Sequence, residues 1–478
     1  MDQFEALYRA VESRDARWDG RVFVGVTSTG IFCRPICPVP MPRRENVQFY
    51  RSAAAAAHAG FRACRRCRPE ESPDSPDWDV RGDLVGRGLR LIGAGVADDD
   101  GIGGLADRLA VSTRHLQRLF VDELGVGPHE VARTRRAGLA KQLLEQTDLS
   151  STDVAFAAGF RSLRAYNEAV RRTFGRSPIE IRDRRRPRGA APSVSLRLAY
   201  RPPLAIDDLL AFVAARSIPG VEGVDGGRYR RAVRGPDGPR LVELEPLRDE
   251  PIVRLTLPAP PPADLAALVR RARRLLDLDA DPATIDAALA TSEPVRSLVA
   301  ERPGVRLPGA FDGWETTVLA ILAQGVSLAS ARVAAGQVAV ALGEPVDVGD
   351  PAIRRLFPPA AAVAAADLSG FGIPARKADT VRAVARAIAD GRVDLEHGDP
   401  AETARTLRTI PGIGPWTAGY VALRVLRDPD AELPGDAAVR AALRRLGLPA
   451  DDVAAKRLAE SWRPWRGYGY VRLWSVVA

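Results

Sequence analysis

The residues best suited to do chemistry in this sequence are its four cysteines, which form two short pairs. Cys33 and Cys37 are separated by three residues, Cys64 and Cys67 by two, and twenty-six residues lie between the pairs. Four thiolates satisfy the tetrahedral preference of zinc, whereas a reducing compartment opposes disulfides. The spacing therefore predicts one zinc ion held by all four cysteines. A purely structural zinc knot remains an alternative at this point.

The sequence around the cysteines adds a resemblance. The stretches FVGVTSTGIFCRPICPVPMPRRENVQFY and AGFRACRRCRPE closely resemble the N-terminal zinc domain of the Ada family, whose members accept methyl groups from DNA phosphotriesters and activate an adaptive response. The resemblance covers about residues 1–72. It implies that Cys33 is the methyl acceptor and that the other three cysteines are the remaining ligands. A thiolate kept deprotonated by zinc is the nucleophile that this reaction needs. Candidate contacts to the DNA backbone flank the motif: Arg34, Arg43, Arg44, Arg65, Arg66 and Arg68.

The charge of such a site predicts a switch. Four thiolates on a divalent cation leave a charge of about −2, which repels DNA phosphates, and methylation of one sulfur leaves about −1. We therefore expect the affinity for DNA to rise when Cys33 is methylated.

Two helix-turn-helix patterns follow. Apolar residues at helical spacing and a helix cap at Ser112 are found in the stretch GGLADRLAVSTRHLQRLFVDELGVGP. The same apolar spacing, with a cap at Ser162, is found in the stretch STDVAFAAGFRSLRAYNEAVRRTFGRSP. The pattern, especially GFRS and FGRSP, resembles the paired domain of AraC-type regulators over residues 103–182, which implies that the second helix of each pair enters the major groove. A helical bundle that binds protein is the alternative. The candidate DNA contacts are Arg114, His115, Gln117, Arg118, Arg161, Arg164, Asn167 and Arg171.

The C-terminal half contains a candidate DNA-binding hairpin, LRTIPGIGPWTAGYVALRVL. Gly412 and Gly414 there allow backbone N–H groups to approach a phosphate at a helix N-terminus. Asp436 follows Trp416 by twenty residues, in LPGDAAVRAALRRL, and taken alone it favours an ordinary helix cap. Together with LAYRPPLAIDDLLAFVAARSIPGVE, these features resemble the AlkA-type helix-hairpin-helix glycosylases, which excise 3-methyladenine, over about residues 195–478.

That resemblance implies a mechanism. A carboxylate near the sugar, Asp436, would stabilise the oxocarbenium-like transition state as a cationic alkylated purine leaves. Trp416, Tyr420 and Trp474 would line the pocket of the flipped base, although core packing is their alternative role. Bifunctional relatives carry a Schiff-base lysine where Trp416 stands. The only lysines of the chain are Lys141, Lys377 and Lys456, so we expect a monofunctional enzyme that leaves an abasic site.

Two finer features follow from the same resemblance. The position of the apolar wedge that AlkA-type proteins push into DNA is Gly325 here, and Gln324 or Val326 are the candidates to replace it. The carbonyls of Arg408, Ile410 and Ile413 are candidates to hold a monovalent cation in the hairpin.

The length of 478 residues requires several domains. Linker-like composition at 70–79 and 182–193 divides the chain. We expect a multidomain protein, mainly α with α+β parts. Its predicted domains are a small zinc α/β domain at 1–75, an AraC-type helix-turn-helix bundle at 83–185, an AlkA-like α+β subdomain at 195–270 and a helical glycosylase domain at 271–478.

The charge of the chain suits a polyanionic partner. The net charge is +9, with 32 Lys and Arg against 25 Asp and Glu in residues 1–189 and 37 against 35 in the rest. An arginine-rich proteome is the alternative explanation.

The opening MDQFEALYRAVESRD is charged and no apolar run is long enough to span a membrane, so we expect a cytoplasmic protein. The expected partner is double-stranded DNA, RNA polymerase is a further candidate, and a monomer is expected. A methylation-triggered activator with a weak or inactive glycosylase half is the rival function.

Overall fold

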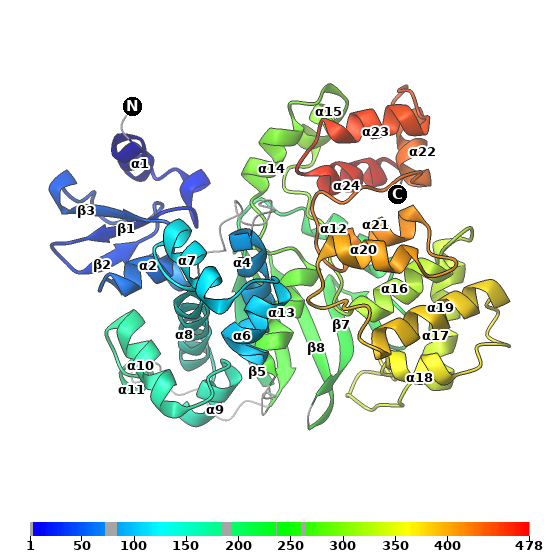
Figure 1. Cartoon of the computed structure of the whole chain (residues 1–478), viewed down its shortest axis with the longest axis horizontal. Helices are drawn as coiled ribbons and strands as arrows, with labels where there is room; N and C mark the ends of the chain where they lie inside the picture. Colours follow the sequence, from blue (N-terminus) through cyan, green and yellow to red (C-terminus); the bar gives the residue numbers. More distant parts are fainter. Residues whose placement is uncertain (1–2, 72–83, 183–192, 236, 260–263, 478) are drawn as a thin grey trace. The chain divides into compact units, whose positions relative to one another are not determined.

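The computed structural model of the chain describes residues 3–71, 84–182, 193–235, 237–259 and 264–477 (Figure 1). Contacts divide it into two compact units, one of residues 1–199 with 258–270 and one of residues 200–257 with 271–478. The linkers predicted at 70–79 and 182–193 lie largely outside the described residues. The four predicted domain boundaries therefore stay predictions.

A small four-stranded sheet opens the first unit. Its strand order is β3-β1-β2-β4; β1 runs antiparallel to both β2 and β3, and β2 runs parallel to β4. Tyr8 on the first helix packs with Val24 and Val47 of the sheet in a small core. The elements are α1 (Gln3–Glu12), β1 (Phe23–Val26), β2 (Ile31–Cys33), β3 (Val47–Tyr50), α2 (Ala53–His58) and β4 (Arg62–Ala63), with short 3-10 turns at Ala16–Trp18, Arg44–Asn46 and Pro69–Glu71.

Helices form the rest of the first unit, and both helix-turn-helix patterns are present. Ser112 caps α7 by accepting a hydrogen bond from the backbone N–H of His115, and Ser162 caps α10 by accepting one from that of Ala165. Both caps stand where the sequence predicts them. The helices are α4 (Leu84–Ala94), α5 (Val96–Asp99), α6 (Gly101–Arg108), α7 (Thr113–Leu124), α8 (Pro128–Gln146), α9 (Ser151–Ala157), α10 (Leu163–Phe174) and α11 (Pro178–Arg182), and strand β5 (Ser193–Ala199) follows.

The four-stranded sheet domain packs directly on these helices. Ala54 and Ala55 of α2 share a hydrophobic cluster with Phe120 of α7. Glu70 and Lys141 of α8 form a buried ion pair, and the Lys141 ammonium lies 5.2 Å from the ring centroid of Phe174 on α10. The cysteine-bearing segment and both helix-turn-helix motifs therefore belong to one packed body.

The second unit contains an antiparallel sheet in the order β9-β8-β7-β6. Strands give way to helices after residue 264. The elements are α12 (Ile206–Ala214), β6 (Glu222–Asp225), β7 (Arg228–Gly235), β8 (Gly238–Leu247) and β9 (Ile252–Pro258).

A helical core built mainly from α16, α17, α19 and α21 supports the candidate site of the second unit. The helices are α13 (Leu265–Leu275), whose residues 265–270 belong to the first unit, α14 (Pro282–Leu289), α15 (Glu293–Glu301), α16 (Gly313–Leu322), α17 (Leu328–Leu342), α18 (Ala360–Ala365), α19 (Ala375–Ala389), α20 (Pro400–Arg408), α21 (Pro415–Arg424), α22 (Ala437–Arg445), α23 (Asp452–Glu460) and α24 (Arg466–Val477). Among the described residues, no helix combines the length and apolar character that crossing a membrane requires.

Candidate functional site

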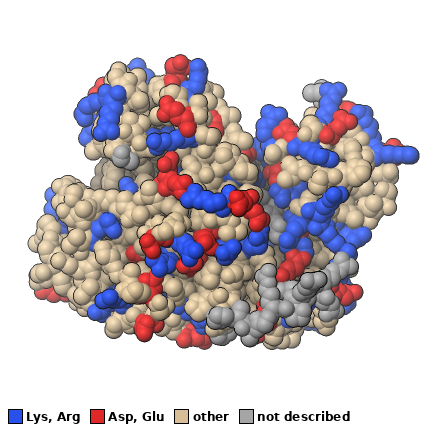
Figure 2. Space-filling model, turned by 180° about the vertical axis from the view of Figure 1, so that it is seen from behind, with Lys and Arg blue, Asp and Glu red and all other residues tan. Residues whose placement is uncertain are grey.

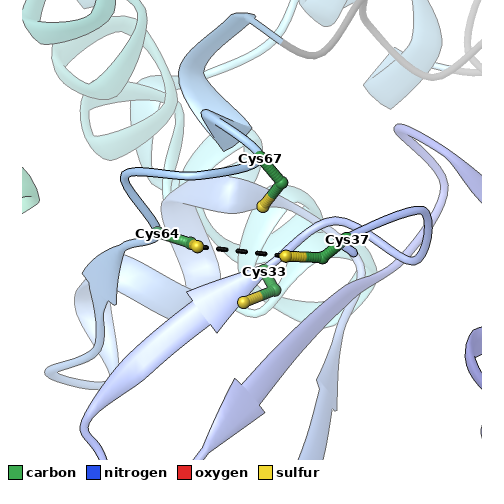
Figure 3. A group of neighbouring side chains, drawn as sticks. All are labelled: Cys33, Cys37, Cys64 and Cys67. Atoms are coloured by element: carbon green, nitrogen blue, oxygen red, sulfur yellow. Dashed lines mark hydrogen bonds between the residues drawn. The ribbon is translucent and has the colours of Figure 1, made fainter. Parts of the chain in front are cut away.

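The four cysteines meet in the first unit (Figure 3). Cys33 is the last residue of β2, and Cys64 directly follows β4. The four sulfur atoms all lie within 4.8 Å of one another, and the Cys37 and Cys64 sulfurs are 4.0 Å apart. A tetrahedron with Zn–S bonds of about 2.3 Å has S–S edges of about 3.8 Å. The sulfur set therefore fits a tetrahedral zinc ion.

Burial and mutual hydrogen bonds perturb the thiols of this cluster. Hydrogen bonds to Cys37 and Cys67 raise the pKa of Cys33, while those from Cys33 and Cys67 lower the pKa of Cys37 to about 2. The backbone N–H of Arg34 donates to the Cys67 sulfur over 3.3 Å. Four buried thiolates this close repel one another, so all four can be ionised together only around a cation.

The arginines predicted to touch DNA beside the cysteines differ in their engagement. Arg34 donates to Asp19 Oδ1 over 2.8 Å and to the carbonyl of Cys67 over 3.3 Å. Arg44 donates to Glu5 over 2.7 Å. The side chain of Arg43 is 85% exposed. Arg43 has a carboxylate partner as well, but Glu45 lies 4.0 Å away and is itself exposed, so Arg43 can turn to a phosphate more readily than the other two.

The predicted reading helix α7 presents Arg114, Gln117 and Arg118 to solvent, while His115 is half-buried. The side chains of His115 and Arg118 are hydrogen-bonded over 3.0 Å. This exposed polar face is the surface that a recognition helix needs.

The second predicted reading helix, α10, exposes Arg164, Asn167 and Arg171. The Asn167 amide donates to the Leu163 carbonyl over 2.8 Å, on its own helix. Arg161 lies just before α10 and donates to the carbonyls of Asp98 and Asp99 over 3.1 and 2.9 Å. Its guanidinium therefore ties the turn before α10 to α5.

A cavity of about 770 Å³ in the second unit brings together the residues predicted for the base pocket. Trp416 and Tyr420 stack with their ring centroids 5.0 Å apart and 22° between the ring planes. Trp474 lies 6.2 Å from Tyr420. These three aromatic residues and Asp436 all line the cavity, although they come from α21, α24 and the start of α22.

Asp436 is a helix cap whose carboxylate also lies at the wall of the cavity. Its Oδ1 accepts the backbone N–H of Val439 over 2.8 Å, as a helix cap does. Indole N–H groups also donate to it, Trp416 Nε1 to Oδ2 over 2.7 Å and Trp474 Nε1 to Oδ1 over 3.3 Å. Because this carboxylate is only 5% exposed, its orientation is fixed by three donors at the wall of the cavity.

Sequence reasoning missed a further set of cavity residues. Phe212 of α12 stacks on Trp474, with centroids 5.8 Å apart, and the Arg216 guanidinium lies 3.5 Å from the centroid of Phe212. Arg424 donates to the Tyr420 hydroxyl over 2.5 Å. Burial alone would raise the pKa of Tyr420, but the cations of Arg424 and Arg216 outweigh it and lower that pKa. Phe212 and Arg216 lie in the stretch LAYRPPLAIDDLLAFVAARSIPGVE, which resembles AlkA-type glycosylases, but nothing in that stretch shows that they reach a cavity beside a hairpin about two hundred residues later.

The hairpin between α20 and α21 requires its first glycine. Gly412 has φ +91°, and a Cβ there would lie 2.0 Å from the Thr380 hydroxyl oxygen. That hydroxyl donates to the Pro411 carbonyl over 3.0 Å. Gly414 caps α21, with open space where a Cβ would stand. The hairpin thus leaves its helix N-terminus sterically accessible.

The three residues at the predicted wedge position, 324–326, differ in their contacts and exposure. Gly325 has φ +66° with nothing within 4 Å of a built Cβ. The Gln324 amide donates to the Gly412 carbonyl over 3.1 Å and to the Thr417 hydroxyl over 2.9 Å. Val326 is 46% exposed. Of the two candidates to replace a wedge at Gly325, only Val326 presents an apolar side chain to solvent.

The lysines lie away from this chemistry. Lys377 donates to the Leu322 carbonyl over 2.7 Å, Lys456 pairs with Glu432 over 3.3 Å, and Lys141 belongs to the first unit. No lysine is found among the described residues that line the cavity. On the face that Figure 2 shows, acidic side chains are interspersed among the basic ones. The net positive charge of the chain therefore does not by itself locate a DNA-binding surface.

Family models match three parts of the chain. The metal binding domain of Ada matches residues 6–70, a helix-turn-helix domain matches residues 105–184, and the AlkA N-terminal domain matches residues 195–312. These matches confirm the predicted resemblances to the Ada zinc domain, to helix-turn-helix regulators and to AlkA-type glycosylases.

Individual proteins extend these matches. A 3-methyladenine DNA glycosylase structure from Archaeoglobus fulgidus shares the fold of the C-terminal part, with a TM-score of 0.50 and 20% identity over 58% of this chain and 96% of that one. DNA-3-methyladenine glycosylase 2 of Escherichia coli is 34% identical over 58% of this chain and 95% of its own length. The probable bifunctional transcriptional activator/DNA repair enzyme AlkA of Mycobacterium tuberculosis is 42% identical over all of this chain and 97% of its own. The chain therefore belongs to the family of this bifunctional activator and repair enzyme.

Proposed function

We propose that the second unit is a DNA glycosylase that excises alkylated purines of the 3-methyladenine type. The observation that carries this proposal is the buried carboxylate of Asp436, fixed by two indole N–H groups at the wall of a 770 Å³ aromatic cavity. A flipped base loses its stacking in the duplex and must stack on protein side chains instead. Electron-rich aromatic rings attract a cationic base. Trp416, Tyr420 and Trp474 supply such rings.

The proposed reaction breaks the N-glycosidic bond and leaves the electron pair on the departing base, which neutralises its charge. Asp436 stabilises the positive charge that develops on the sugar and accepts the proton of the attacking water. The indole N–H groups of Trp416 and Trp474 keep the carboxylate pointed at the sugar. The absence of lysine from the described cavity lining supports a monofunctional enzyme that leaves an abasic site.

The test is release of methylated purines from duplex DNA by Asp436→Asn. We expect at least about a hundredfold slower release, because the charge that stabilises the transition state is lost while the cap to Val439 is kept. Asp451→Asn is the matched control, since Asp451 caps α23 with bonds to the N–H groups of Val453 and Ala454 and lines no part of the cavity. Equal rates in wild type and Asp436→Asn would remove Asp436 from the mechanism.

Contacts to the DNA are assigned to three features of the second unit. Gly412 and Gly414 offer backbone N–H groups to a phosphate. Val326 takes the wedge position that Gly325 leaves empty, while Gln324 braces the wedge loop on the hairpin. The carbonyls of Arg408, Ile410 and Ile413 are the proposed ligands of a monovalent cation that would strengthen the hold on the phosphate.

We propose that Cys33 in the first unit takes a methyl group from a DNA phosphotriester, with Cys37, Cys64 and Cys67 as the other ligands of one zinc ion. Bound zinc keeps the thiols deprotonated. The loss of one negative charge on methylation then favours double-stranded DNA, which α7 and α10 meet through their exposed polar faces. RNA polymerase is the further partner that activation requires, and the chain is proposed to act as a monomer.

The switch is tested by the affinity for a promoter before and after exposure to methyl-phosphotriester DNA. We expect tighter binding after exposure in wild type and no change in Cys33→Ala. An intact response in Cys33→Ala, or an unchanged affinity in wild type, would overturn the proposed acceptor role. Either result leaves the excision proposal standing, because excision is measured on the second unit.

A further inference from the structure

A small hollow adjoins the cysteine cluster and has no place in the function proposed so far. Its volume is about 60 Å³, and it lies between the end of α1, strand β1 and the segment 33–42. Its walls are mainly apolar, from Val24, Val26, Val39, Met41 and Pro42. Charged side chains border it as well: Glu12, Arg14 and Arg34.

The hollow distinguishes among the four sulfurs. Cys33 and Cys37 border it, whereas Cys64 and Cys67 do not. Cys33 is 6% exposed and stands opposite Val24 in the register of β1 and β2. Cys33, the proposed acceptor, therefore forms part of the wall of this apolar space.

Alkyl transfer to sulfur is a displacement at carbon. The S–C bond forms as the C–O bond of the phosphotriester breaks, the electron pair stays on the phosphate oxygen to give a diester anion, and the thiolate becomes a thioether. The alkyl carbon must lie in line between sulfur and oxygen, so the rest of the alkyl group occupies the space beside the sulfur. Apolar walls favour such a group. The phosphate that carries it would meet Arg14 at the border, or Arg34 once Arg34 exchanges Asp19 for the phosphate.

We propose that this hollow is the alkyl-binding subsite of the phosphotriester reaction and sets the largest alkyl group that Cys33 accepts. This inference rests on the acceptor role proposed for Cys33. A water-sized group needs about 10–15 Å³ of such volume, so the hollow of about 60 Å³ holds about four to six non-hydrogen atoms. Methyl to butyl triesters fit, and heptyl and longer triesters do not. Met41 and Val26 set the limit.

The test is transfer from methyl, butyl and heptyl phosphotriester DNA to the full-length zinc-loaded protein, followed by intact-protein mass. Met41→Ala enlarges the hollow, and we expect the heptyl-to-methyl rate ratio to rise about tenfold or more. Val26→Leu fills it, and the butyl-to-methyl ratio should fall by a similar factor. Val47→Ala is the control, because Val47 packs in the same small core opposite Val26 but lines no part of the hollow.

Ratios that stay within twofold of wild type in both variants, while methyl transfer persists, would overturn the subsite and leave the acceptor role of Cys33 intact. Absence of methyl transfer in wild type would overturn both. A second readout avoids rates altogether: after transfer of a ¹³C-methyl group, its nuclear Overhauser contacts should reach the methyl groups of Val26 and Met41. Contacts confined to other residues would place the alkyl group elsewhere.

Discussion

Replacing Lys141 by methionine should destabilise the first unit by about 3 kcal/mol. The Lys141 ammonium pairs with Glu70, whose side chain is 4% exposed, while the side chain of Lys141 itself is 9% exposed. Methionine keeps most of the apolar stem but removes the charge. Glu70 would then remain as a buried carboxylate without its main counterion.

The magnitude follows from this burial. Removing one partner of a buried ion pair costs about 3–5 kcal/mol, because the other charge stays desolvated. Arg68 Nε remains 3.7 Å from the same Glu70 oxygen and supplies part of the lost attraction. We therefore expect the lower end of the range. Lys456→Met is the matched control, since its pair with Glu432 has side-chain exposures of 64% and 38% and should be worth at most about 1 kcal/mol.

Native-state hydrogen exchange by mass spectrometry measures this change unit by unit. Peptides from α8 should exchange about a hundredfold faster in Lys141→Met, because about 1.4 kcal/mol corresponds to a factor of ten. Peptides from α24 in the second unit serve as an internal reference. In Glu70→Gln/Lys141→Met, where no unpaired charge is left, more than half of the lost protection should return.

Two results would refute the reasoning. A change in α8 below about 1 kcal/mol, equal to that of Lys456→Met, would mean that Glu70 finds water or another cation without cost. A double variant as unprotected as the single one would mean that the packing of Lys141 matters and its charge does not.

Four further outcomes are expected. Gly412→Ala should abolish most excision in a protein whose first unit is unchanged, because its Cβ would meet the Thr380 hydroxyl at 2.0 Å; excision at the wild-type rate would show that the hairpin can adjust. Val326→Ala should slow excision opposite a paired base more than from a mismatch, as a stopped-flow base-flipping assay can measure, and equal slowing would deny it a wedge role. Ser112→Ala and Ser162→Ala should each cost about 1 kcal/mol in denaturant unfolding, with no change if the caps are dispensable. Chelation of zinc should loosen the first unit in hydrogen exchange and leave base release unchanged, since the cavity is lined by residues of the second unit alone; a parallel loss of base release would contradict this.

Local chemistry made parts of this structure predictable from the sequence. Ser112 and Ser162 cap the helices that they were expected to cap, because a cap depends on residues within one helical turn. The cluster of four cysteines was predictable for a similar reason, since cysteines separated by only two or three residues can bind the same metal ion. The helix cap at Asp436 was predictable in the same way, and the structure adds two indole donors to its carboxylate. The catalytic role of Asp436 stays a proposal.

Long-range packing limited the rest. Phe212 and Arg216 reach the aromatic cavity from α12. The stretch around them resembles AlkA-type glycosylases, but it does not show which of its side chains pack against residues much later in the chain. The bonds of Arg161 to carbonyls of α5 were hidden for the same reason. The contact of Arg161 with DNA stays a prediction. To make it, Arg161 would have to give up its hydrogen bonds to the carbonyls of Asp98 and Asp99.

The gathering of every cysteine of the chain into one cluster makes its chemical state countable. The sequence has four cysteines, and all four sulfurs lie in this site. After chelation and denaturation, a thiol-specific dye should therefore titrate four equivalents in a fresh molecule and three in one that has accepted an alkyl group. In a mixed population, an average between three and four free thiols per molecule would give the fraction of molecules that have already accepted an alkyl group. The thiol count therefore records how many molecules have reacted.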